Sequence, residues 1–195
     1  DNYDITKTEG QLTVTKIVTP IVIKADSDNK VYDGSALTKD SFTYTQNVLA
    51  EGDELTAVVE GSQTDAGSSA NVVKSYKVMR GDVDVTANYT FGESVNGTLT
   101  VTKRPVTIES ADLNKVYDGT ALTNGETALK TETGWVEGEG ATYTFTGSQL
   151  DPGSSSNAFT YTLNSNTKAD NYDITKTEGQ LTVTKIVTPI VIKAD

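Results

Sequence analysis

Residues 1–26 read DNYDITKTEGQLTVTKIVTPIVIKAD, and residues 170–195 repeat this string without a single change. Between these two copies, KVYDGSALT at residues 30–38 recurs as KVYDGTALT at residues 115–123. The offsets indicate a unit of about 85 residues, two of which make a longer repeat of about 169 residues. Self-similarity at a fixed period predicts a tandem array, and the unchanged copy indicates a recent duplication within it.

The repeated strings set the predicted boundaries along the chain. Residues 1–18 are the C-terminal part of a preceding repeat, residues 19–103 and 104–186 are two full β repeats, and residues 187–195 start the next repeat. A unit of this size can enclose a small core of its own, so we expect domains arranged end to end rather than a continuous solenoid. The joint between them, TKRPV, is short and contains proline, which predicts a semi-rigid connection.

An alternation of apolar residues and threonine predicts β-strands. QLTVT at residues 11–15, and LTVT at residues 99–102 and 181–184, place Leu and Val on one face and Thr on the other, as half-buried strands require. The chain holds 32 threonines, and no stretch of a dozen residues keeps the apolar spacing of a helix. The sequence therefore predicts an all-β fold.

We expect each repeat to be a small immunoglobulin-like β-sandwich, because Asp65, Gly67 and then Tyr76 resemble the corner before a sandwich's penultimate strand. A β-grasp-like unit, with a short helix near residues 47–55, is the alternative. Residues 1–18 carry only the last two strands of a repeat, and a two-stranded hairpin is marginal in water. We therefore do not expect this segment to be ordered without strands that pair with it.

Charge and composition exclude several classes of function. The formal net charge of -11 opposes binding to nucleic acid and to anionic membrane surfaces. The chain has no Cys and no His, which removes thiol nucleophiles, disulfides, histidine bases and the usual zinc and copper sites. Its apolar runs are too short to cross a bilayer, so we expect no membrane insertion of this segment. The composition favours a protein that is not an enzyme and needs no cofactor.

The best-preserved internal motif is a Tyr-Asp-Gly string that occurs once in each full repeat. It lies at Tyr32, Asp33 and Gly34 in the first repeat, and the second repeat has it at Tyr117, Asp118 and Gly119. We interpret both copies as structural turns, in which Asp bonds the local backbone and Gly adopts a positive φ. A binding role for the pair is the alternative interpretation.

A second motif, Arg80-Gly81-Asp82, spells the tripeptide that integrins recognise and lies between two predicted strands. A hairpin turn is the simpler interpretation, because Gly and Asp are expected there in any case. The corresponding turn of the second repeat is near Asn164-Ser165-Asn166, so the fold does not require the tripeptide.

A short oxygen-rich loop is a candidate site for a structural calcium ion. It contains Asp26, Asp28 and Asn29, and hard cations such as Ca²⁺ bind several such oxygens at once. The spacing does not match an EF-hand, and the second repeat lacks one of the carboxylates. Solvated loop charges are the alternative interpretation.

The order of four motifs resembles the YDG/MBG-type tandem repeats of bacterial cell-surface adhesins. These motifs are KVYDG[ST]ALT, GSQTxxGSSxN, DVTxNY and NGTLTVTK, and in the first repeat they begin at Lys30, Gly61, Asp84 and Asn96. The second repeat departs in detail, with Leu150-Asp151-Pro152 and Glu178-Gly179-Gln180 at two of these places. The resemblance brings no catalytic residues.

The resemblance implies a stalk of spacer repeats that holds a distal binding domain away from the cell wall. The protein would then be secreted and anchored at the cell surface through a segment outside this chain. Its partners would be neighbouring repeats of the same chain. In the alternative, the repeats themselves bind a host glycan, mucin or matrix protein, or an integrin through the Arg-Gly-Asp tripeptide.

Overall fold

The computed structural model describes residues 2–125 and 129–188, and these residues form two compact units. Among them, the first unit comprises residues 2–28, 37–63 and 68–99, and the second comprises residues 29–36, 64–67, 100–125 and 129–188. The repeat boundaries predicted above run continuously along the chain. In the structure, two short segments that precede residue 100, one of which carries the first Tyr-Asp-Gly motif, belong to the second unit.

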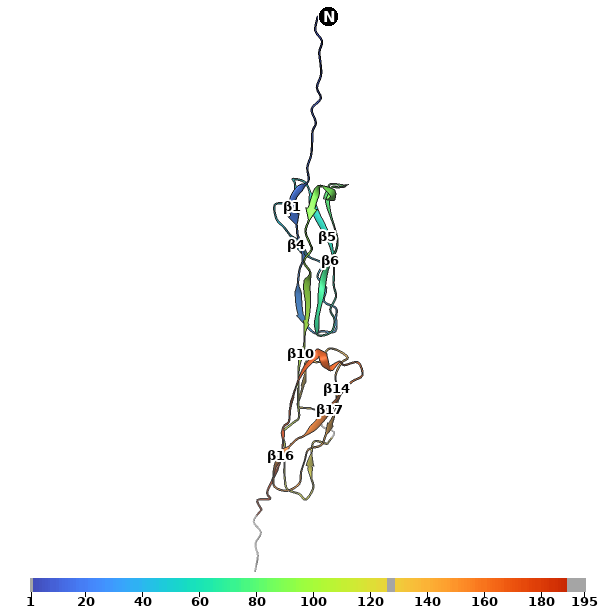
Figure 1. The fold of residues 1–195 in the computed structure, drawn as a ribbon. Coiled ribbons are helices and arrows are strands. Elements are labelled where there is room, and N and C mark those ends of the chain that lie inside the picture. Colours follow the sequence, from blue (N-terminus) through green and yellow to red (C-terminus); the bar gives the residue numbers. More distant parts are fainter. Residues whose placement is uncertain (1, 126–128, 189–195) are drawn as a thin grey trace, which may run out of the picture. The chain divides into compact units, whose positions relative to one another are not determined.

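Short β-strands make up nearly all of the regular structure, so the all-β prediction is confirmed (Figure 1). The first nine strands are β1 (Ile17–Ile21), β2 (Ile23–Ala25), β3 (Asp28–Val31), β4 (Phe42–Tyr44), β5 (Glu54–Glu60), β6 (Gly67–Arg80), β7 (Val83–Asp84), β8 (Tyr89–Phe91) and β9 (Gly97–Thr102). The remaining strands are β10 (Arg104–Glu109), β11 (Leu113–Val116), β12 (Leu122–Thr123), β13 (Thr131–Thr133), β14 (Ala141–Phe145), β15 (Ser148–Gln149), β16 (Gly153–Ser156), β17 (Phe159–Leu163), β18 (Tyr172–Thr177) and β19 (Gln180–Thr184). Two 3-10 turns, η1 (Thr86–Asn88) and η2 (Ala169–Asn171), precede β8 and β18.

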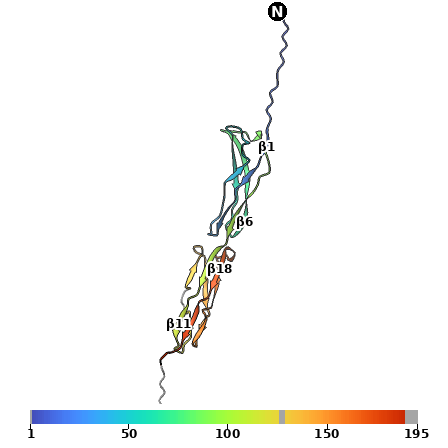
Figure 2. The same ribbon diagram turned by 90° about the vertical axis from the view of Figure 1, so that its left-hand side faces the viewer.

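Parallel pairing joins the first strands of the second repeat to its last strands. β10 pairs with β18 in parallel from Arg104 opposite Tyr172 to Glu109 opposite Thr177. β11 then pairs with β19 in parallel, with Leu113 opposite Leu181. Antiparallel partners flank these pairs, β13 beside β10 and β16 beside β19. The remaining strands of this repeat form the antiparallel pairs β12–β15 and β14–β17, and Figure 2 shows the same strands from a second side.

The earlier strands follow a related plan. β1 pairs in parallel with β8, and β2 pairs with β4 in an antiparallel ladder. A further sheet has the order β3-β9-β6-β5, with β7 hydrogen-bonded to β6. A core cluster lies among these strands and includes Ile21, Ile23, Leu55, Val78 and Tyr89.

The predicted alternation holds in two of its three copies. In β9 the side chains of Leu99 and Val101 are buried, and in β19 those of Leu181 and Val183 are 0% and 2% exposed. Residues 2–16 have the sequence of residues 171–185 but form no strand, and Leu12 and Val14 are 99% and 98% exposed. The strand predicted at residues 11–15 is therefore wrong for this copy.

The two outcomes have one physical cause. The buried copy lies against β10 and β11, which supply its hydrogen bonds and cover its apolar face. A strand that lacks such partners gains too little burial to offset the entropy lost on ordering. The same sequence is therefore a strand only where the first strands of its own repeat lie beside it.

The short helix expected near residues 47–55 in the β-grasp alternative is not formed in this fully described segment. Turns occupy residues 46–47 and 51–52, where Asn47 and Gly52 have φ values of 60° and 81°, and β5 begins at Glu54. These left-handed residues interrupt a helix on both sides of Val48. Val48 and Leu55 instead enter the core cluster directly from a turn and a strand.

Two further predictions concern the ends of the chain and membranes. Of the residues 187–195 predicted to start a further repeat, 189–195 lie outside the described residues. Within the described ranges, no helix has the length and apolar character needed to cross a membrane.

Because the two copies are identical, they offer a matched pair of substitutions. Leu181→Ala is expected to lower the free energy of unfolding by about 2–5 kcal/mol, since it deletes a fully buried side chain. Leu12→Ala, the same change in the same sequence, should stay within about 0.5 kcal/mol because Leu12 is exposed. Denaturant unfolding followed by the fluorescence of Trp135 measures Leu181→Ala, since its ring packs 4.8 Å from that of Tyr172 at the start of β18. Circular dichroism of the strands, which both units contain, measures Leu12→Ala in the first unit. Equal effects of the two substitutions would contradict this explanation.

Candidate functional site

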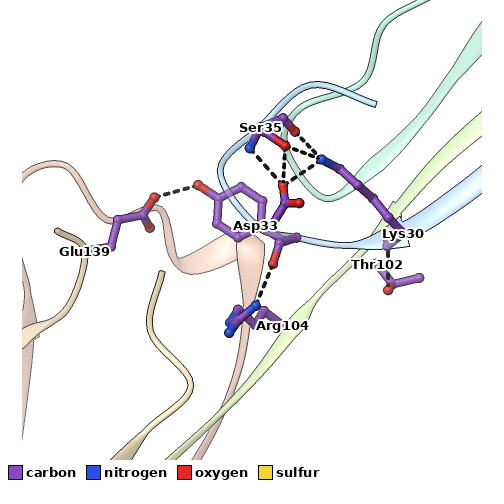
Figure 3. Close-up of polar contacts among 7 residues, drawn as sticks. Lys30, Asp33, Ser35, Thr102, Arg104 and Glu139 are labelled. Carbon is purple, nitrogen blue, oxygen red and sulfur yellow. Dashed lines mark hydrogen bonds and ion pairs between the residues drawn. The ribbon is translucent and has the colours of Figure 1, made fainter. Parts of the chain in front are cut away.

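Each Tyr-Asp-Gly motif forms a bend in which the Asp carboxylate organises the backbone. Asp33 Oδ1 accepts hydrogen bonds from the Ser35 backbone N–H at 2.9 Å and from Lys30 Nζ at 2.6 Å. Lys30 Nζ also donates to the Ser35 carbonyl at 2.6 Å (Figure 3). Gly34 between them has φ = 80°. The Lys30 ammonium, followed by the Ser35 donors, holds the pKa of Asp33 well below its ordinary value.

The second motif reproduces this geometry. Asp118 Oδ1 accepts from the Thr120 N–H at 2.9 Å and from Lys115 Nζ at 2.8 Å, and Gly119 has φ = 82°. Lys115 Nζ also donates to the Thr120 carbonyl at 2.6 Å. The Lys at the start and the Ser or Thr at the end of KVYDG[ST] therefore belong to the bend, and Gly supplies the left-handed backbone that the bend needs.

The two motif tyrosines differ in their surroundings. Tyr32 is buried, and its ring lies edge-on at 5.5 Å from that of Tyr172. Its hydroxyl donates to Glu139 Oε1 at 2.6 Å, the bond drawn as a dashed line to Glu139 in Figure 3. Tyr117 is only half-buried. Tyr32, Glu139 and Tyr172 all belong to the second unit, and we call them the tyrosine cluster.

Glu139 is the centre of the tyrosine cluster because it accepts two phenol hydrogen bonds. Its Oε2 accepts from Tyr172 at 2.7 Å, and the Tyr172 hydroxyl in turn accepts the Val136 backbone N–H at 3.2 Å. The bond to Glu139, aided by burial, raises the pKa of Tyr32 to about 12. Burial, aided by the same carboxylate, raises the pKa of Tyr172 to about 12. Both phenols therefore stay protonated as donors at neutral pH.

Polar contacts fix the backbone around the tyrosine cluster. Arg104, the first residue of β10, donates from its side chain to the Gly134 carbonyl at 2.5 Å and to the Tyr32 carbonyl at 3.4 Å. No sequence pattern pointed to Arg104 or Glu139. Their partners lie 30 and 107 positions away in the chain, so no local motif could have identified them.

A second group of contacts in the same unit involves Asp65. Its carboxylate accepts from Lys168 Nζ at 2.6 Å and from the buried amide of Asn171 at 2.9 Å. The side-chain oxygen Oδ1 of Asn171 accepts the Ala66 backbone N–H at 2.7 Å, which closes the ring of contacts. These bonds, the Lys168 one first, hold the pKa of Asp65 below its ordinary value.

Buried asparagines explain another part of the repeated motif. Asn71 and Asn157, the last residues of GSSAN and GSSSN, are both fully buried. The Asn71 amide donates to the carbonyls of Asp26 and Lys39 at 2.9 and 2.7 Å, and the Asn157 amide donates to the Ala111 carbonyl at 2.8 Å. Each side chain thus holds together segments that are distant in sequence, which is a structural role that the sequence did not reveal.

The Arg-Gly-Asp tripeptide lies where β6 turns into β7, with Gly81 at φ = 55°. Arg80 makes a two-pronged ion pair with Asp53, with N–O distances of 2.5 and 3.0 Å. The Asp53 side chain is 1% exposed, and it also accepts the hydroxyl of Tyr89 at 2.5 Å. The Arg80 guanidinium and then the Tyr89 phenol hold the pKa of Asp53 below its ordinary value. Binding of Arg80 to an integrin would break this ion pair and leave the Asp53 carboxylate, which is nearly inaccessible to solvent, without a cation.

A cavity of about 430 Å³ lies beside this ion pair in the first unit. Its wall includes Ile17, Ala50, Asp53, Arg80, Asn88 and Tyr89, together with residues 14–16. The volume falls in the range of small-molecule sites, and the wall combines an aromatic ring with a paired carboxylate and guanidinium.

The calcium candidates Asp26 and Asp28 each contact a neighbouring side chain. Asp26 Oδ2 accepts the Ser41 hydroxyl at 2.6 Å, and Asp28 Oδ2 lies 3.7 Å from Lys39 Nζ. Asn29 follows Asp28 on β3, where successive side chains point to opposite faces. Over residues 2–125 and 129–188, no group of three or more His, Cys, Asp or Glu side chains is placed to hold a metal ion.

The tyrosine cluster predicts an alkaline transition. Its phenols titrate near pH 10 in the unfolded chain and near pH 12 in the fold, so the stability they supply is complete below about pH 10. That stability should fall as the pH rises from about 10 to about 12. Tyr32→Phe should remove about 1.5–3 kcal/mol at neutral pH and weaken this alkaline dependence. Urea unfolding across this pH range measures both effects.

The matched control for this substitution is Tyr117→Phe, in the equivalent bend of the second repeat. It should change the stability of the chain less than Tyr32→Phe does, because Tyr117 is half-buried. Equal losses from the two substitutions, or an alkaline dependence that Tyr32→Phe leaves unchanged, would contradict the role given to the tyrosine cluster.

Comparison of the chain with family models, with curated proteins and with solved structures finds no match.

Proposed function

We propose that this chain consists of non-enzymatic spacer repeats of a secreted bacterial surface adhesin, which project a distal binding domain from the cell wall. The unchanged 26-residue copy and the repeated KVYDG motif support a tandem array of one structural unit. The resemblance to YDG/MBG-type adhesin repeats supports the surface role. The net charge of -11 favours repulsion between neighbouring stalks at low salt.

We further infer that each repeat is an immunoglobulin-like β-sandwich. Antiparallel pairs such as β14–β17 and β10–β13, in which Phe159 and Ile108 are buried, support this inference. The turns at residues 46–47 and 51–52, where a β-grasp-like unit would carry its helix, favour the sandwich.

The observation that carries the proposed function is the parallel pairing of first and last strands. The second repeat begins with β10 and ends with β19, and the pairs β10–β18 and β11–β19 join these ends. Tension applied to the start of β10 and the end of β19 acts along the strands in opposite directions. It loads the hydrogen bonds of both pairs together, so many must break at once. Such a repeat resists pulling, which a stalk under load requires.

Single-molecule pulling tests this proposal directly. The chain has no cysteine, so Cys handles can be placed at chosen sites. Lys103→Cys with Lys185→Cys pulls the parallel pairs in shear, whereas Lys103→Cys with Asp170→Cys pulls from one end and opens them rung by rung. All three residues are exposed. We expect a several-fold higher unfolding force in the shear geometry, since forced unfolding follows the unfolding rate.

Equal or lower force in the shear geometry would contradict a load-bearing role. The binding-module alternative is tested separately by exposing the protein to immobilised glycans, mucin and integrins, with and without Ca²⁺. Micromolar or tighter attachment would favour that alternative. No attachment is expected for a spacer, and the ion pair between Arg80 and Asp53 opposes use of the tripeptide.

A further inference from the structure

The two units contain the same tyrosine–carboxylate arrangement. In each, a core tyrosine at the start of a late strand accepts a backbone N–H, at 2.9 Å for Tyr89 and 3.2 Å for Tyr172. The same hydroxyl donates to a carboxylate three residues after that N–H, which is Asp53 in the first unit and Glu139 in the second. The two sites are therefore equivalent positions of one repeated design.

The two sites differ in the third side chain that contacts the carboxylate, which is Tyr32 at Glu139 and Arg80 at Asp53. In the second unit, Glu139 accepts the Tyr32 hydroxyl at 2.6 Å, and the Tyr32 ring is buried against its neighbours. In the first unit, Asp53 pairs with Arg80, and the cavity of about 430 Å³ lies beside the pair. A filled site and an open site thus occupy corresponding places.

Backbone hydrogen bonds show where a third tyrosine of this kind would lie. Tyr32 donates its N–H to the Thr102 carbonyl at 2.9 Å, and Tyr117 donates its N–H to the Thr184 carbonyl at 2.8 Å. Both acceptors are the second threonine of a TVTK string. The third TVTK string occupies residues 13–16, and its second threonine, Thr15, lines the cavity. A motif tyrosine held by Thr15 in the same way would stand at the cavity.

We propose that the cavity of the first unit is the docking site for the tyrosine side chain of a Tyr-Asp-Gly bend, carried by a preceding repeat of the second kind. This proposal rests on the proposed array, in which repeats like residues 19–103 (first type) alternate with repeats like residues 104–186 (second type), and it names the partner that each first-type repeat binds. Residues 170–185 end the second-type repeat and are identical to residues 1–16. The repeat that ends in residues 1–16 is therefore of the second type, and its Tyr-Asp-Gly bend corresponds to the one that contains Tyr117.

The chemistry of the cavity fits a phenol. Asp53 accepts three hydrogen bonds from Arg80 and Tyr89, and a carboxylate offers about four acceptor positions. Its side chain is 1% exposed, so the incoming hydroxyl reaches it when the half-exposed Arg80 side chain moves aside. The Arg80 guanidinium, which is half-exposed, supplies a cation for the face of an aromatic ring. The Tyr89 ring offers the edge contact that Tyr172 provides to Tyr32 in the second unit.

An extended chain tests the proposal. A copy of residues 104–169 is placed directly before residue 1 of the full chain. Because residues 1–26 are identical to residues 170–195, the added copy and residues 1–17 together form a complete second-type repeat with its native sequence. Residues 46–56 and 85–95 occur once in this protein, so their hydrogen exchange reports the first unit alone. We expect their amides, that of Ala50 above all, to exchange several-fold more slowly than in the 195-residue chain.

Two placements of one substitution separate docking from a local effect. Tyr117→Phe in the added repeat should abolish the extra protection, because the phenol that reaches Asp53 is lost. Tyr117→Phe in the resident second repeat should leave that protection unchanged. In a chain that also carries Asp53→Asn, Tyr117→Phe in the added repeat should change the protection of residues 46–56 and 85–95 much less, as expected for a coupled pair.

The proposal would be overturned if the extended chain gave the first unit no extra protection, or if that protection persisted with Tyr117→Phe in the added repeat. It would also be overturned if Tyr117→Phe caused the same loss of protection in the added repeat and in the resident second repeat. Failure of the array itself is seen separately, since residues 1–16 should become protected in the extended chain whether or not the tyrosine docks. Failure of the load-bearing role is judged by the pulling experiment, which uses the 195-residue chain.

Discussion

The structure of the second repeat depends on the parallel pairing of β10 with β18 and β11 with β19. Parallel strands cannot be joined by a tight turn, so the strands between them must fold over before the ends of the repeat can meet. The last strands are therefore closed by partners about 70 residues earlier in the chain. Burial of Leu181 and Val183 accompanies that closure, and the exposed copy of the same sequence shows what happens without it.

The tyrosine cluster lies at one end of this parallel pairing. Arg104 and Tyr172 are the first opposed residues of β10 and β18, and both take part in contacts to Tyr32 or Glu139. The contacts that begin the strand pair are thus the same contacts that hold a Tyr-Asp-Gly bend. This coincidence gives the bend a reason to be preserved between repeats, beyond the local hydrogen bonds of Asp33.

Sequence patterns predicted the features that depend on neighbours in the chain. Threonine alternation identified β9 and β19, and Gly34 marks a bend that needs a positive φ. The same alternation failed at residues 11–15, because burial depends on partner strands that the pattern does not contain. Contacts such as Glu139 with Tyr32 join residues more than 100 positions apart, and Arg80 gave no local sign of its pairing with Asp53.

The same sequence therefore forms two paired strands at residues 171–185 and no strand at residues 2–16. Hydrogen exchange read by mass spectrometry tests it most directly, because the peptide TKTEGQLTVTK arises from residues 6–16 and from residues 175–185 with the same mass. We predict two populations of equal size, one exchanging at the rate of an unprotected chain and one strongly protected. A single population, whether protected or unprotected, would show that the two copies have the same structure.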